Sequence, residues 1–208
     1  MKISRFRALA LVTVAALVLG GCAAPGQGQP GVAAVFHDRV ITNANIEALR
    51  AGLNDLYSGP NAGEDVTLLL IGPEVVALAD QLGLGLTDAQ LKSEAELWIA
   101  YATQGQVTPT TISPGAIEIV RVVEAINLLM HNADGELALI KLVTDVEANT
   151  VASPRYGKFT LKNFTTSIAA ISKYIDDNSQ GLAGAEYTQW KDVNGFDVTN
   201  TVDWISNG

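Results

Sequence analysis

The stretch VAAVFHDRVITNANIEAL, residues 32–49, decides the fold because it changes from strand-like to helix-like sequence within one short run. Residues 32–36 and 39–41 are β-prone and flank His37-Asp38, which is typical of a tight hairpin. The apolar residues that follow recur at helical spacing and predict a helix over residues 43–57. The chain therefore opens with two paired strands that lead directly into a helix.

Three further helices are predicted by apolar residues at helical spacing, over residues 65–82, 88–103 and 113–148. Pro73 lies inside the first of them, where it is expected to break or kink the helix or to start a new one. His131-Asn132 lies inside the last and is expected to interrupt it. The middle of the chain is thus predicted to be helical throughout.

The sequence after these helices changes character again. Residues 152–159 are predicted to be extended, and residues 164–174 form one more helix. We expect Tyr156–Phe159 to lie beside Ala33–Phe36, because a lone two-stranded hairpin is only marginally stable in water. A third strand from distant sequence would then tie the two ends of the helical region together.

These elements predict a mainly α domain over residues 32–184, with a small β element formed by the N-terminal hairpin and the later extended segment. Residues 185–208 are predicted to form an extended tail that contains three large aromatic side chains, Trp190, Phe196 and Trp204. We expect this tail to dock on its own chain rather than on a partner, although large aromatics also suit a partner surface.

The N-terminal region has the organisation of an export signal. Residues 1–21 begin with three basic side chains and continue with an apolar run over residues 8–20, which is too short to span a bilayer as a helix. The run ends in Leu19-Gly20-Gly21-Cys22, which resembles the bacterial lipobox, an aliphatic residue and two small residues before a cysteine. Residues 1–21 are therefore interpreted as a lipoprotein signal peptide.

Cys22, the single cysteine of the chain, then becomes the lipid attachment site. Its thiol would take a diacylglyceryl group with fatty acyl chains such as palmitate, and two or more chains hold a protein stably on a bilayer. Residues 22–31 are rich in Gly, Pro and Gln and are predicted to be a flexible tether. The expected location is the extracytoplasmic face of the cell membrane, with membrane lipid as a partner through Cys22.

The charge balance argues against some partners. The whole chain carries 13 basic and 22 acidic side chains, and three of the basic ones lie in residues 1–21. The segment after the signal peptide is therefore strongly acidic, which disfavours nucleic acid and anionic lipid headgroups as partners. The same charge favours solubility and is able to attract cationic segments of a protein.

No catalytic, cofactor-binding or metal site is expected from the sequence. The two histidines, His37 and His131, are predicted to be solvated, and no familiar nucleophile, zinc or phosphate-loop motif is present. Arg155-Tyr156 is able to grip a peptide, but we favour a buried Tyr156 with Arg155 bonded to a carboxylate or carbonyl. The protein is therefore predicted not to be an enzyme.

Three landmarks together resemble the N-terminal chaperone domain of SurA-type proteins, a fold also seen in the trigger-factor C-terminal region. They are the hairpin and helix of residues 33–49, the Leu-Gly turn and Thr-Asp helix start of residues 77–91, and Pro154-Arg155-Tyr156-Gly157. The resemblance covers roughly residues 32–160. It implies a helical domain in which the segment after the helices returns to the first strand.

The resemblance implies a domain that binds unfolded or exported polypeptide clients in a groove between helices, without catalysis. Many relatives carry a parvulin-type prolyl isomerase domain, but the 51 residues after Gly157 are too few for one, so none is expected here. Gly72-Pro73 departs from the family pattern and is expected to alter the shape of the groove. The alternative function is a structural or adaptor lipoprotein that binds one specific envelope partner.

Replacing the cysteine tests the anchor directly. Cys22→Ser should leave the precursor unlipidated and move any processed protein from the membrane to the soluble fraction, because serine cannot form the thioether. Fractionation and N-terminal analysis would measure this, and the wild-type mature chain should begin at Cys22. A processed Cys22→Ser protein that stays on the membrane would contradict the prediction.

Overall fold

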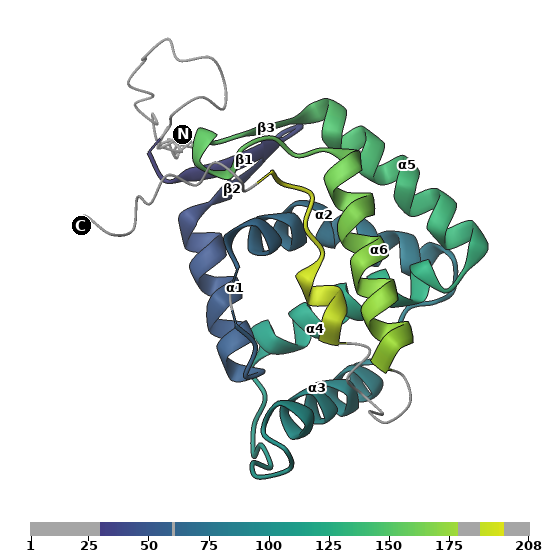
Figure 1. Ribbon diagram of the computed structural model, residues 1–208. Helices are drawn as coiled ribbons and strands as arrows, with labels where there is room; N and C mark the ends of the chain where they lie inside the picture. The colour runs from purple at the N-terminus through teal and green to yellow at the C-terminus, as the bar shows by residue number, and fades with distance from the viewer. Residues whose placement is uncertain (1–29, 60, 179–187, 198–208) are drawn as a thin grey trace, which may run out of the picture.

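The computed structural model describes residues 30–59, 61–178 and 188–197, and within them it has six α-helices and a three-stranded sheet at one end of the helices (Figure 1). The elements in chain order are β1 (Val32–Phe36), β2 (Arg39–Thr42), α1 (Asn43–Asp55), α2 (Ala62–Gln81), α3 (Asp88–Ala102), α4 (Pro114–Met130), α5 (Ala133–Asn149), β3 (Thr150–Ala152), η1 (Pro154–Tyr156), α6 (Leu161–Asn178) and η2 (Gln189–Asp192). The predicted fold class, mainly α with a small β element, is confirmed.

The hairpin forms where the sequence predicts it. Phe36 pairs with Arg39 across the two-residue turn, and His37 takes a left-handed φ of 50°. Thr42 then caps α1, since the Asn45 N–H donates to the Thr42 Oγ1 at 3.2 Å and the Thr42 N–H donates to the Asn45 Oδ1 at 2.8 Å. This reciprocal capping box fixes the point at which strand becomes helix.

The third strand of the sheet comes from a different segment than the sequence suggested. Strand β3 pairs antiparallel with β1 through Thr150–Ala152, and the prediction that Tyr156–Phe159 would occupy this place is wrong. Pro154 has no N–H for the ladder and instead begins the 3-10 turn η1. Tyr156 is nevertheless buried, at 1% exposure, so its expected place in the core is confirmed.

Two expectations about helix boundaries have different outcomes. The predicted interruption near His131 is confirmed, because α4 ends at Met130 and Asn132 caps α5. Of the three alternatives expected at Pro73, a break, a kink or a new helix, the break and the new helix do not occur, because α2 runs continuously through it. Among the described residues no helix combines the length and apolar character needed to cross a membrane.

The described part of the C-terminal tail packs onto the body of the protein, as predicted. Trp190 is 1% exposed, and its indole N–H donates to the Asn127 Oδ1 of α4 at 3.0 Å. Phe196 packs edge-on against Phe159 with ring centroids 5.3 Å apart and forms an isolated β-bridge with it. The tail is not extended throughout, since residues 189–192 form the short helix η2, and Trp204 lies outside the described residues.

Trp190→Ala should lower the free energy of unfolding by about 3 to 5 kcal/mol, because it removes a large buried ring and leaves the Asn127 amide without its indole donor. Urea titration would measure this. Tyr174→Ala, an aromatic truncation at a side chain that is 43% exposed on α6, is the matched control. Equal midpoints for the two variants would contradict a core role for the tail.

Candidate functional site

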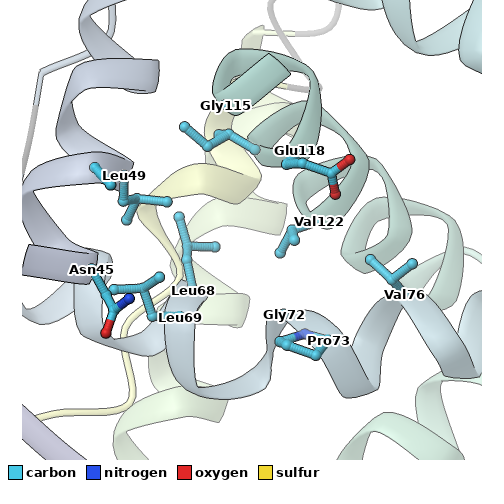
Figure 2. Close-up of a pocket in the computed structure, with 12 residues that line it drawn as sticks. Asn45, Leu49, Leu68, Leu69, Gly72, Pro73, Val76, Gly115, Glu118 and Val122 are labelled. Carbon is cyan, nitrogen blue, oxygen red and sulfur yellow. The ribbon is translucent and has the colours of Figure 1, made fainter. Parts of the chain in front are cut away.

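An open apolar groove lies between α1, α2 and α4 and has a volume of about 470 Å³ (Figure 2). Its walls come from three helices that are distant in the sequence, and the residues that line it are Asn45, Ala48, Leu49, Leu68, Leu69, Gly72, Pro73, Val76, Gly115, Glu118, Ile119 and Val122. Cavities of this size are typical of small-ligand and side-chain binding sites. The groove is therefore the candidate functional site.

Two close helix crossings determine where the groove opens. A Cβ atom on Gly52 of α1 would lie 2.7 Å from the Ile119 Cδ1 of α4, and one on Gly72 of α2 would lie 3.0 Å from the Val122 Cγ2. Both distances are too short for an unadjusted neighbour, so the two glycines allow α1 and α2 to approach α4 closely. Ile119, Gly72 and Val122 also line the groove, so the hollow lies directly beside both contacts.

Pro73 shapes the α2 wall of the groove. Proline has no N–H, so the Leu69 carbonyl, one turn earlier, lacks the donor that it would normally have within a helix. Arg39 of β2 supports the same region, since its guanidinium donates to the Leu70 carbonyl and to the Glu74 carboxylate, the latter at 2.9 Å. The sheet thereby braces the helix at the proline.

Polar groups are confined to the edges of the groove. Asn45 lies beside Leu69, and Glu118 lies along the α4 wall between Gly115 and Val122 (Figure 2). The Asn45 Oδ1 is already occupied by the capping box, which leaves the Nδ2 group as its donor for a bound molecule. The site thus combines an apolar floor with a few hydrogen-bonding groups, an arrangement suited to binding.

The residues that the sequence singled out lie elsewhere. Cys22 is outside the described residues. The His37 Nε2 lies 3.1 Å from the Asp145 carboxylate at an exposed position, and His131 is also exposed. Within residues 30–59, 61–178 and 188–197, no group of three or more His, Cys, Asp or Glu side chains is placed to hold a metal ion. Neither histidine lines the groove.

Arg155 and Tyr156 interact with each other. The Arg155 guanidinium lies 4.6 Å from the centroid of the Tyr156 ring and donates to its hydroxyl group. The prediction that Arg155 would bond a carboxylate or carbonyl is therefore wrong in its partner.

Sequence reasoning missed a chain of buried polar groups beneath the tail. Glu124 is 4% exposed, and its carboxylate accepts a hydrogen bond at 3.3 Å from the Asn127 amide, which in turn accepts from Trp190. Burial, opposed by the Asn127 hydrogen bond and reinforced by Glu94, raises the pKa of Glu124 to about 7. A glutamate in helical phase with core positions is the signal that would have identified it.

Two further acids with raised pKa values, Glu64 and Asp65, lie near the start of α2. Burial raises the pKa of Asp65 even though the Arg50 Nε donates to its carboxylate at 2.7 Å. Burial and the neighbouring Asp192 raise the pKa of Glu64 to about 7. None of these acids lines the groove, so they concern stability and the seating of the tail rather than ligand binding.

Comparison with known proteins adds no relative: no family model matches the chain, and no curated protein or solved structure shows significant similarity to it.

The buried acids predict an unusual dependence of stability on pH. A carboxyl group whose pKa is raised on folding stabilises the folded state below its unfolded pKa and loses this effect as pH rises through its folded pKa. The Glu124 and Glu64 contributions should therefore be present near pH 4 and lost progressively from there to above pH 7.

Glu124→Gln should raise the free energy of unfolding at pH 8 relative to wild type and leave it nearly unchanged near pH 4. The gain should not exceed a value on the order of 3 kcal/mol, since one pKa unit corresponds to about 1.4 kcal/mol. Urea titrations across this range would measure it, with Glu96→Gln at an exposed site of α3 as the control. A constant difference between Glu124→Gln and wild type at all pH values would contradict the prediction.

Proposed function

We propose that this protein is a lipid-anchored, extracytoplasmic domain of SurA-like character that holds apolar segments of unfolded or exported polypeptides, without catalysis. The observation that carries the proposal is the open apolar groove between α1, α2 and α4. The described part of the tail packs around Asn127 and Phe159 and contributes no residue to the groove lining. The groove thus remains available to a polypeptide as far as residues 188–197 are concerned.

The size of the groove sets the strength of binding. A volume of about 470 Å³ accommodates one or two large apolar side chains. Burying each contributes about 1.5 to 3 kcal/mol. The dissociation constant is then about 6 to 80 millimolar for one side chain and falls to about 40 micromolar when two are fully buried. Binding of this strength is rapidly reversible, as is needed to hold a chain that must later fold.

The anchor complements such weak binding. The Gly31 carbonyl accepts a hydrogen bond from the Asn43 N–H at 2.8 Å, so the chain enters the fold next to the first turn of α1. Asn45, two residues further on, lines the groove. A tether ending at this point would keep the groove close to the membrane surface, where the effective concentration of emerging chains is raised.

An adaptor that binds one specific envelope protein is the second candidate. The confined dimensions of the groove favour it, because a hollow for one or two side chains also suits a single anchoring residue of a fixed partner. Crosslinking in intact membranes separates the two functions. A diverse set of partners supports client holding, and one stoichiometric partner supports the adaptor.

Filling the groove tests the proposed function. Ala48 is exposed on the groove side of α1, so Ala48→Trp should place a ring in the hollow without disturbing the core. We expect at least a tenfold loss of affinity for an apolar peptide and loss of the ability to slow aggregation of an unfolded client. Anisotropy and light scattering would measure these effects.

Ala44→Trp provides the matched control, since Ala44 is exposed one turn earlier on α1 and does not line the groove. This variant should bind and protect clients like the wild type. Equal behaviour of the two tryptophan variants, or a wild-type protein in molar excess that fails to slow aggregation, would refute client binding in the groove.

A further inference from the structure

The edge of the groove formed by α4 carries excess negative charge. Glu118 is the one charged side chain among the described residues that line the groove, and it is 67% exposed. Arg121 lies 3.5 Å from the Glu118 carboxylate and 3.0 Å from the Asp88 carboxylate. One guanidinium therefore serves two carboxylates, which leaves a net negative charge at this edge.

The opposite edge presents groups that match a peptide backbone. The Asn45 Nδ2 group is a donor because the capping box occupies its Oδ1. Leu69 also lines the groove, and Pro73 has no N–H to donate to the Leu69 carbonyl one turn earlier. A polypeptide supplies both a carbonyl oxygen and an N–H group at each residue, whereas a hydrocarbon chain supplies neither. The groove edges are therefore better matched to a polypeptide than to an acyl chain.

The next step rests on the proposed function. We propose that the groove selects polypeptide segments in which one apolar residue fills the groove and a neighbouring lysine or arginine forms an ion pair with the Glu118 carboxylate. The excess of acidic over basic side chains in the whole chain acts in the same direction, since it raises the local concentration of cationic segments. A segment with an acidic neighbour would instead place a carboxylate against Glu118.

The expected selectivity is modest because Glu118 is exposed. Exposed ion pairs change affinity by about two- to fivefold, and a like-charge contact reverses the sign of the effect. A peptide with a neighbouring lysine should therefore bind about tenfold more tightly than one with glutamate at low salt. The difference should shrink at high salt, since exposed charges are screened.

Three fluorescent peptides that share one apolar core and differ only in the neighbouring residue, Lys, Gln or Glu, provide the probe. Binding to the mature chain carrying Cys22→Ser would be measured by anisotropy at low and high salt. We expect affinity to fall in the order Lys, Gln, Glu. Glu118→Gln should reduce the differences in affinity among the three peptides, and Glu118→Lys should reverse their order.

Glu96→Lys, at an exposed site of α3 outside the groove, controls for the change in net charge and should preserve the order. Urea midpoints would confirm that both lysine variants are folded. Equal affinities for the three peptides at low salt would overturn the charge selection and leave the proposed function standing. Binding of a fatty acid with no binding of any peptide would overturn both.

Discussion

The close packing of α4 against α1 and α2 is the constraint on which the rest of the structure depends. Gly52 and Gly72 allow α4 to approach both helices at distances that a larger residue would not permit. The buried face of α4 is apolar. Its side chains Ile119, Val123 and Ile126 are fully or almost fully buried. Ile119, Gly72 and Val122 take part in these close contacts and also line the groove, so the same packing that joins the three helices shapes the groove.

Local signals made much of the fold predictable. The hairpin and the interruption at His131 each depend on residues that lie within a few positions of one another. The third strand was misplaced because its register depends on pairing with β1 across more than a hundred residues, and on Pro154 ending the ladder. Pro73 remains inside a helix because tertiary contacts, among them the Arg39 hydrogen bonds, offset the missing backbone bond.

The candidate site was much less predictable. Histidines, aromatics and Arg155 attract attention in a sequence because their side chains carry chemistry, yet none of those identified in the described residues lines the groove. The groove is made instead by Gly72, Pro73 and ordinary apolar residues, and its position depends on how three helices cross. Only the Gly72-Pro73 dipeptide indicated an altered groove, and no local pattern indicates where the hollow opens, because its position depends on tertiary packing.

Different faces of α2 and α4 serve stability and binding. Thr67 of α2 accepts a hydrogen bond at 3.0 Å from the Gly195 N–H of the tail, while the next two residues, Leu68 and Leu69, line the groove. On α4, Asn127 receives the Trp190 indole, whereas Glu118 and Val122 face the hollow. The described part of the tail, residues 188–197, therefore packs on one side of these helices and contributes no residue to the groove on the other. Because the buried acids lie on the tail side, changes in their ionisation alter how firmly the scaffold is held without placing a new charge in the groove.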